Sequence, residues 1–215
     1  MKGIGKLHVI TDIVLQSRFS HEKLTEAAIA GGADTIQFRQ KVGSTRDLID
    51  SASRMSRICK DAGVTFIVND RLDIAMASKA DGVHLGQDDF PIPFARRLLG
   101  RDMIIGGSAA TIEEAGICLS EGADYVGFGP VFPTGSKNDA GPVSGILVLR
   151  QVVKTIPLPV VAIGGIDEKN IPAVLRAGAW GIAVISAVCC QEDPEKAARS
   201  LYHALKAEES GGTND

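Results

Sequence analysis

Eight short apolar segments recur along the chain, and their spacing constrains the fold more than any other feature of the sequence. Each segment is rich in β-branched residues and apolar nearly throughout, as expected for a strand whose two faces are both buried in a parallel sheet. The segments cover residues 7–11, 35–39, 65–69, 82–86, 103–107, 125–129, 160–165 and 181–186. The stretches between them leave room for the helix that a parallel connection usually contains.

The connecting stretches show helical spacing of apolar residues together with helix-end signals. Thr111 precedes Glu114 by three residues, which is the pattern of a capping box. Glycine, the residue that most often terminates a helix, closes three of the stretches, at Gly31, Gly122 and Gly178. The clearest predicted helices cover residues 21–32, 47–63, 111–122, 170–179 and 194–207.

Eight alternating strand–helix units in a chain of 215 residues favour a single (β/α)8 barrel, the TIM barrel. The main structural alternative is a doubly wound parallel sheet. That fold usually has fewer strands, and its dinucleotide fingerprint GxGxxG is missing after the first apolar segment. We therefore expect one barrel domain over residues 1–207 and a small, polar, disordered tail over residues 208–215.

The composition excludes several classes of partner. Hydrophobic residues make up 45% of the chain and charged residues 23%, which is ordinary for a soluble protein. The net charge of −3 predicts no broad basic face for nucleic acid, so an anion must be held by a few local groups. No apolar run approaches the roughly 20 residues of a membrane helix, and the N-terminus lacks a signal peptide. We expect a cytoplasmic protein with no membrane partner, and the sequence leaves open whether it forms a homo-oligomer.

The histidines and cysteines carry no predicted chemistry. The four cysteines form no CxxC pair, so we expect reduced, buried thiols rather than a zinc site. His84 lies within the fourth apolar segment and is expected to be a hydrogen-bonded core histidine. His21 and His203 fall on predicted helices and are expected at the surface.

The second apolar segment ends in alternating polar residues at the edge where TIM-barrel active sites lie. Gln37, Arg39 and Lys41 share one face of this strand, and Phe38 and Gln40 share the other. Three polar side chains facing the barrel axis are costly unless a ligand uses them. The alternative is that Arg39 pairs with an internal carboxylate.

Two carboxylates follow neighbouring segments, Asp70 after the third and Asp89 after the fourth. Two carboxylates that converge beside cations favour Mg²⁺, a hard ion that shares its oxygen ligands with substrate phosphates. The alternative is that they cap the following helices, especially Asp88 and Asp89 before Pro91.

Glycines and hydroxyls at later strand ends predict a second anion site. Gly164 and Gly165 let backbone N–H groups approach a phosphate closely, and Ser186 follows the eighth segment. The sixth segment leads into a run with two hydroxyls, a glycine and an amine, residues 134–137. Two anion sites and a magnesium ion favour a reaction on phosphorylated small molecules that expels diphosphate.

Together these motifs resemble the thiamine phosphate synthase family, along nearly the whole chain. The resemblance rests on QFRQK at residues 37–41, on HLGQDD at 84–89, on GPVFPTGSK at 129–137 and on AIGGI at 162–166, with an Asn-Asp pair at 69–70. It implies a transferase that joins hydroxymethylpyrimidine diphosphate to a thiazole phosphate, giving thiamine phosphate and diphosphate.

The resemblance also implies roles for particular residues. The pyrimidine diphosphate would be held by Gln37, Phe38, Arg39, Gln40, Lys41, Asn69, Ser108 and Lys137. Of these, the catalytic group would comprise Arg39, Lys41, Ser108 and Lys137. The thiazole phosphate would be held by Thr134, Gly135, Ser136, Gly165, Ile185 and Ser186. The Mg²⁺ ion would be held by Asp70 and Asp89.

The sequence leaves two rival functions open. A sister family of thiazole tautomerases resembles the chain too, but those enzymes use a histidine just after the fifth strand, where this chain has Ala110. The tautomerase also has no use for Arg39 and Lys41 together with two metal-binding carboxylates. The other rival is a non-catalytic barrel that binds a phosphorylated vitamin precursor as a regulator.

Overall fold

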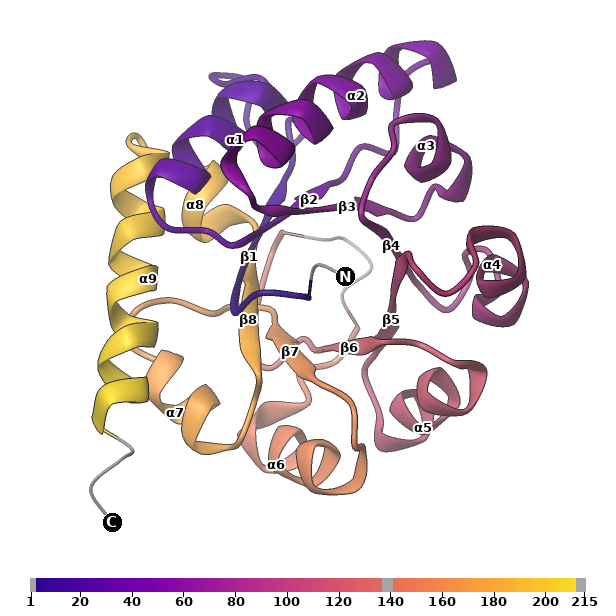
Figure 1. Ribbon diagram of the computed structural model, residues 1–215. Helices are drawn as coiled ribbons and strands as arrows, with labels where there is room; N and C mark the ends of the chain where they lie inside the picture. The colour runs from indigo at the N-terminus through magenta and orange to yellow at the C-terminus, as the bar shows by residue number, and fades with distance from the viewer. Residues whose placement is uncertain (1–2, 137–140, 212–215) are drawn as a thin grey trace.

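The computed structural model describes residues 3–136 and 141–211, and its eight strands form one closed barrel (Figure 1). The strands are β1 (Leu7–Thr11), β2 (Thr35–Phe38), β3 (Thr65–Asn69), β4 (Gly82–Leu85), β5 (Ile104–Ala109), β6 (Tyr125–Phe128), β7 (Val160–Ile163) and β8 (Gly181–Val184). Every neighbouring pair is parallel, and β8 returns to pair with β1. The predicted TIM barrel is confirmed, and the doubly wound alternative is excluded.

Helices surround the barrel, as Figure 1 shows. They are α1 (His21–Ala30), α2 (Thr45–Ala62), α3 (Leu72–Ala77), α4 (Ile92–Leu99), α5 (Ile112–Glu121), α6 (Gly145–Thr155), α7 (Ile171–Arg176), α8 (Ser186–Cys189) and α9 (Pro194–Gly211). The predicted cap is present, because the Thr111 side chain accepts from the N–H of Glu114, and Gly122 ends α5 in the left-handed conformation. Among the described residues, no helix has the length and apolar character to cross a membrane.

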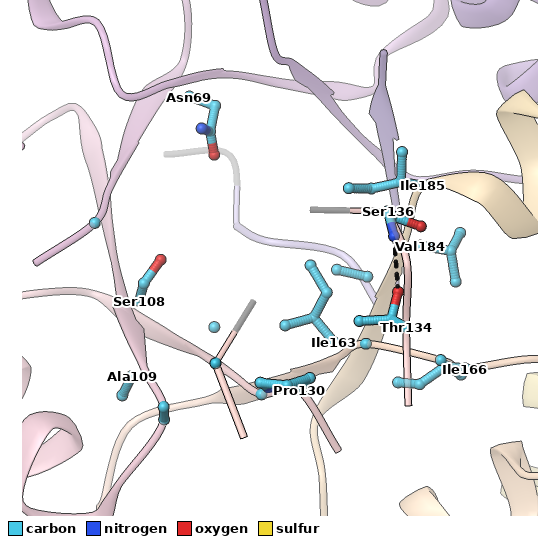
Figure 2. Close-up of a pocket in the computed structure, with 18 of the residues that line it drawn as sticks. Asn69, Ser108, Ala109, Pro130, Thr134, Ser136, Ile163, Ile166, Val184 and Ile185 are labelled. Atoms are coloured by element: carbon cyan, nitrogen blue, oxygen red, sulfur yellow. Dashed lines mark hydrogen bonds between the residues drawn. The ribbon is translucent and has the colours of Figure 1, made fainter. Parts of the chain in front are cut away.

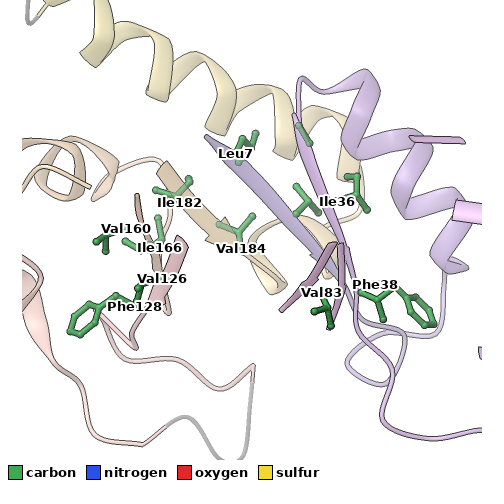
Figure 3. Packing of buried hydrophobic residues seen from close by; sticks show 14 of the residues in the cluster. Leu7, Ile36, Phe38, Val83, Val126, Phe128, Val160, Ile166, Ile182 and Val184 are labelled. Atoms are coloured by element: carbon green, nitrogen blue, oxygen red, sulfur yellow. The ribbon is translucent and has the colours of Figure 1, made fainter. Parts of the chain in front are cut away.

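The core has two parts, which explains why the strands are apolar on both faces. The larger part lies between the strands and the helices, and Figure 3 shows some of its members, including Ile36, Val83 and Val126. The smaller part fills the inside of the barrel and includes Ile67 and Tyr125. Alternate residues of each strand therefore point into one part or the other.

The C-terminal helix is longer than the sequence predicts. Helix α9 continues to Gly211, whereas the tail was expected to begin at residue 208. The reason is an ion-pair cluster on its last turns: the Glu209 carboxylate lies 2.5 Å from the amine of Lys6 and 2.8 Å from that of Lys206. Residues 212–215 of the predicted tail lie outside the described residues.

The prediction that His21 lies at the surface is wrong. Its imidazole is 2% exposed, and its ring nitrogens lie 2.7 Å from the Thr11 hydroxyl and 2.6 Å from the Gln40 side-chain oxygen. The first turn of α1 packs over the ends of β1 and β2, a placement that periodicity along the helix does not reveal. Burial lowers the pKa of His21, so the ring is held in its neutral form.

His8 lies fully buried inside the barrel, with its Nε2 3.0 Å from the carbonyl oxygen of Gly5. Burial lowers the pKa of His8 from its usual value near 6.5 to about 4. Between about pH 4 and pH 6.5 the His8 imidazole is therefore protonated in the unfolded chain and neutral in the folded chain.

We predict that His8→Leu flattens the pH dependence of stability in this window. The free energy of unfolding that His8 contributes above pH 6.5, about 3 kcal/mol, is lost as the pH falls toward 4. Urea unfolding at a series of pH values measures the slope. The exposed His203→Gln is the control and should leave the slope unchanged; equal slopes in His8→Leu and the wild type would contradict the prediction.

Candidate functional site

A cavity of about 390 Å³ opens at the carboxyl ends of the strands. Its wall is built from residues that end or follow most of the strands, including 69–70, 86–89, 108–110, 163–166 and 184–187. Figure 2 shows Asn69 and Ser108 on one side of it, and Thr134, Ser136 and Ile185 on the other. The cavity therefore has two ends with different polar groups.

The structure brings most of the predicted site residues to this cavity. Those that line it are Lys41, Asn69, Asp70, Asp89, Ser108, Thr134, Ser136, Gly165, Ile185 and Ser186. Those that do not are Gln37, Phe38, Arg39, Gln40 and Gly135. Lys137 lies outside the described residues.

The end of β2 differs from the prediction, because the strand stops at Phe38. Phe38 points outward into the core between strands and helices, where it is 2% exposed. Gln37 points inward, but it lies in the barrel interior, where its amide donates to the Tyr125 hydroxyl at 3.2 Å. Gln40 contacts His21 and donates to the carbonyl of Val42 at 2.9 Å. Each of these side chains packs against or hydrogen-bonds to other residues of the protein, and none of them lines the cavity.

Arg39 forms an ion pair with Asp12, so the alternative left open by the sequence is the one observed. The pair is nearly buried, with side-chain exposures of 12% for Arg39 and 2% for Asp12. The other oxygen of Asp12 accepts from the N–H groups of Val14 at 2.8 Å and Leu15 at 3.1 Å. Asp12 therefore ties the end of β2 to the loop after β1.

Asp70 has an unusual backbone conformation at the edge of the cavity. Its φ of 67° is in the left-handed region, which is uncommon for a residue with a side chain and often marks a functional site. Its N–H donates to the carbonyl of His84 at 2.8 Å, and its carboxylate accepts from the amide of Asn69. These contacts hold the Asp70 side chain at the wall of the cavity.

Asp89 has a local partner as well as a place at the cavity. One oxygen of its carboxylate accepts from the N–H of Gly86 at 2.6 Å, which closes the turn after β4. The sequence left open that Asp89 caps the following helix. The observed bond is similar in kind, but it closes the turn that contains Asp89 and does not cap the N-terminus of α4. Asp89 and Asp70 nevertheless line the same cavity.

The opposite end of the cavity is shaped by glycines. Gly164 and Gly165 have φ values of 96° and 63°, and a Cβ atom at Gly165 would lie 2.8 Å from that of Phe132. The segment after β6 therefore packs directly on this turn, with the N–H of Phe132 donating to the carbonyl of Gly164 at 3.0 Å. The Ser136 hydroxyl donates to the Ser186 hydroxyl at 2.9 Å, which places two hydroxyls side by side.

The cavity wall also contains residues to which the motifs assign no ligand, among them Gln87, Ala110 and Glu114. The Gln87 amide donates to the carbonyl of Ser108 at 2.6 Å, and the Glu114 carboxylate accepts from the N–H of Ala110 at 2.6 Å. The capping box had identified Glu114 as a helix-start residue, and its nearness to the cavity follows because α5 starts at the end of β5.

A closed barrel with a polar cavity at the carboxyl ends of its strands defines a TIM-barrel protein with its site in the usual place for that fold. A family model described as thiamine monophosphate synthase matches residues 7–188, and the chain belongs to this family. The resemblance found in the motifs is thus confirmed, and the chain is an enzyme of the transferase class.

Individual relatives agree with the family. A thiamine-phosphate synthase from Methanocella arvoryzae is 56% identical over 195 residues, which cover 91% of this chain and 92% of the relative. One from Salinibacter ruber is 51% identical, covering 95% of this chain and 90% of the relative. A solved structure of a thiamine phosphate pyrophosphorylase from Pyrococcus furiosus has 41% identity and a TM-score of 0.87, and the match covers 94% of this chain and 96% of that one.

We predict that Asp12→Asn destabilises the protein by about 3 kcal/mol, because it leaves the Arg39 charge nearly buried without its partner. The free energy of unfolding in urea measures the loss. Glu195→Gln is the matched control: it removes an exposed ion pair to Arg199 and should cost no more than about 0.5 kcal/mol. Equal losses in the two variants would show that the Asp12 pair has no special role.

Proposed function

We propose that the protein is a thiamine-phosphate synthase that joins hydroxymethylpyrimidine diphosphate to a thiazole phosphate with release of diphosphate. The observation that carries the proposal is the two-ended cavity: an amide, a lysine and carboxylates line it after the neighbouring strands β2, β3 and β4, and hydroxyls and glycine backbone line it after β6, β7 and β8. The chain that folds around it is 56% identical to a protein named thiamine-phosphate synthase.

The diphosphate would occupy the end that contains Lys41, Asn69 and Ser108. The Lys41 amine supplies positive charge, and the Asn69 amide and Ser108 hydroxyl supply hydrogen bonds to phosphate oxygens. Lys137, which the motif assigns to the same group, is proposed as a second cation. Arg39 would contribute its charge from outside the cavity wall, because its guanidinium is paired with Asp12.

The thiazole phosphate would occupy the other end. Ser136 and Ser186 present adjacent hydroxyls, and Gly165, which is exposed and has no side chain, lines the same cavity and would offer its backbone to a phosphate. Such groups suit a singly phosphorylated ligand. Apolar lining from Ile163 and Ile185 would pack against the ring.

The family resemblance implies a magnesium ion, and the residues present fit one. Asp70 and Asp89 line the same cavity, after the neighbouring strands β3 and β4, and offer the hard oxygen donors that Mg²⁺ takes. The described residues hold no group of three or more His, Cys, Asp or Glu side chains placed to bind a metal, so two carboxylates would share the ion with phosphate and water oxygens. When bound, the ion would stabilise the negative charge of the departing diphosphate.

The protein's own part in the reaction is binding and orientation. Positive charge and hydrogen bonds at the diphosphate end favour departure of the leaving group, whose electron pair goes to the diphosphate oxygen. The thiazole nitrogen then attacks with its own lone pair, so the step needs no general base. Orientation of two bound substrates contributes on the order of 7–11 kcal/mol in favourable cases.

The tautomerase alternative finds no support at the end of β5. Ala110 lines the cavity where a catalytic histidine would be needed, and its N–H is already bonded to Glu114. The described part of the cavity wall contains no histidine side chain in its place.

The function is tested by incubating the purified protein with both substrates and Mg²⁺ and measuring diphosphate release. We expect release only when both substrates are present, together with a product of the mass of thiamine phosphate. Isomerisation of the thiazole substrate without the pyrimidine diphosphate or Mg²⁺ would identify a tautomerase instead. Binding of either ligand without turnover would identify a regulatory binding protein.

We predict that Asp70→Asn raises the Mg²⁺ concentration needed for half-maximal rate by about tenfold or more, because a charged ligand is replaced by a neutral one. A Mg²⁺ titration of the rate measures this. Asp88→Asn is the matched control, since Asp88 lines the same cavity but is not assigned to the metal. An equal shift in both variants would show a general effect of charge and would contradict the assignment of Asp70.

A further inference from the structure

A chain of hydrogen bonds runs from the barrel interior to the cavity. The Gln37 amide donates to the Tyr125 hydroxyl at 3.2 Å, and that hydroxyl lies 2.9 Å from Nδ1 of His84. Nε2 of His84 lies 2.9 Å from the hydroxyl of Ser108, which lines the cavity. Gln37, His84 and Tyr125 are buried, with exposures of 2%, 8% and 1%.

Two glycines of the barrel provide the space that the side chains of this hydrogen-bond chain occupy. His84, Gly106 and Tyr125 lie side by side in register on β4, β5 and β6. A Cβ atom at Gly106 would lie 2.5 Å from Nδ1 of His84 and would overlap the Tyr125 ring, and one at Gly127 would lie 2.8 Å from Cε1 of His84. Glycine inside a strand lowers stability, so two glycines here indicate that the space itself is needed.

The direction of the hydrogen bonds follows from counting protons. Burial raises the pKa of Tyr125 far above its usual value, so its phenol keeps one proton. The hydroxyl oxygen accepts from the Gln37 amide, so the acceptor within reach of its own proton is Nδ1 of His84. Nε2 of His84 then carries the ring proton and donates it to Ser108. The Ser108 hydroxyl has to direct its own proton elsewhere, and the cavity lies beside it.

The opposite direction fits less well. If Nδ1 of His84 carried the ring proton and donated it to Tyr125, the Tyr125 proton would need the Gln37 side-chain oxygen as its acceptor. The Gln37 amide would then have to be turned over, and its buried amide nitrogen would lose the Tyr125 acceptor. This direction would also make Ser108 donate to His84 and present lone pairs to an anionic ligand. The present direction leaves only the Gln37 side-chain oxygen without a partner among the described residues, and an unpaired acceptor is the more common of the two situations.

We propose that His84, supported by Tyr125, is a positioning residue that fixes the Ser108 hydroxyl as a hydrogen-bond donor toward the cavity. The role rests on the proposed function, in which Ser108 contacts the diphosphate. It also gives Gln37 a part in the site, through its hydrogen bond to Tyr125. Because negative charge on the diphosphate grows as the bond breaks, a fixed donor acts mainly on kcat rather than on KM.

The tautomer of His84 is the first test, and it needs no activity. Long-range proton–nitrogen correlation spectra of ligand-free protein with ¹⁵N-labelled histidine report which ring nitrogen carries the proton. The His84 signals are assigned by comparison with His8→Leu and His84→Gln. We expect the neutral form with the proton on Nε2; a proton on Nδ1, or on both nitrogens, would overturn the proposal. Because no substrate is present, this result stands even if the protein fails to release diphosphate.

A double-mutant cycle is the second test, read as kcat and KM. Ser108→Ala removes the donor and should lower kcat by about 100-fold or more. Tyr125→Phe removes the hydrogen bond that fixes the His84 tautomer, and it should lower kcat by about tenfold with KM nearly unchanged. Adding Tyr125→Phe to Ser108→Ala should cost no further activity, since both changes act on one donor. Multiplied losses would mean that Tyr125 has a merely structural role and would overturn the proposal.

Matched variants complete the experiment. The side-chain amide of Gln reaches the position of Nε2, so His84→Gln keeps a donor to Ser108 and should retain much more activity than His84→Asn. Similar losses in the two variants would contradict the proposal. Tyr202→Phe, on the outer helix α9, is the control for removing a tyrosine hydroxyl and should not change kcat.

Discussion

The pairing of β8 with β1 is the contact on which the rest of the structure depends. Leu7 and Val9 lie in parallel register with Ile182 and Val184, and the N–H of Ile182 donates to the carbonyl of Lys6 at 2.7 Å. This contact closes the sheet and brings the carboxyl ends of all the strands to one rim. An open sheet of the same strands would spread the candidate site along an edge, whereas the closed one gathers it around a single cavity.

Beneath that rim the inside of the barrel holds both apolar side chains and buried polar ones. Tyr125 belongs by its ring to the apolar interior with Ile67 and Val161, and by its hydroxyl to the hydrogen-bond chain that ends at Ser108. Gln37, Tyr125 and His84 are buried, and hydrogen bonds in such surroundings are electrostatically stronger than in water. The same packing inside the barrel thus buries the apolar side chains and holds the hydrogen-bond chain in order.

The sequence predicts the strands well because burial on both faces leaves an apolar run that can be read locally. It predicts the position of the site because the fold places strand ends together, so Asn69, Asp70 and Ser108 meet at the cavity as expected. It leaves open that Arg39 pairs with an internal carboxylate but does not identify Asp12, and it does not predict that His21 is buried over the strand ends. These depend on which side chains from distant elements reach each other, and alternation along one strand carries no information about that.

The charge balance of the cavity gives the proposed metal a physical reason. Within the described residues its wall holds the carboxylates of Asp70, Asp88, Asp89 and Glu114 against the single amine of Lys41, and the chain as a whole carries a net charge of −3. A wall of this kind disfavours a bare diphosphate, because like charges at short range repel in surroundings that water screens poorly. Asp89 and Glu114 are partly satisfied by N–H groups of their own turns. The Asp70 carboxylate likewise accepts from the Asn69 amide. A divalent cation shared by Asp70 and Asp89 would neutralise part of this negative charge and would make the cavity attractive to phosphate oxygens.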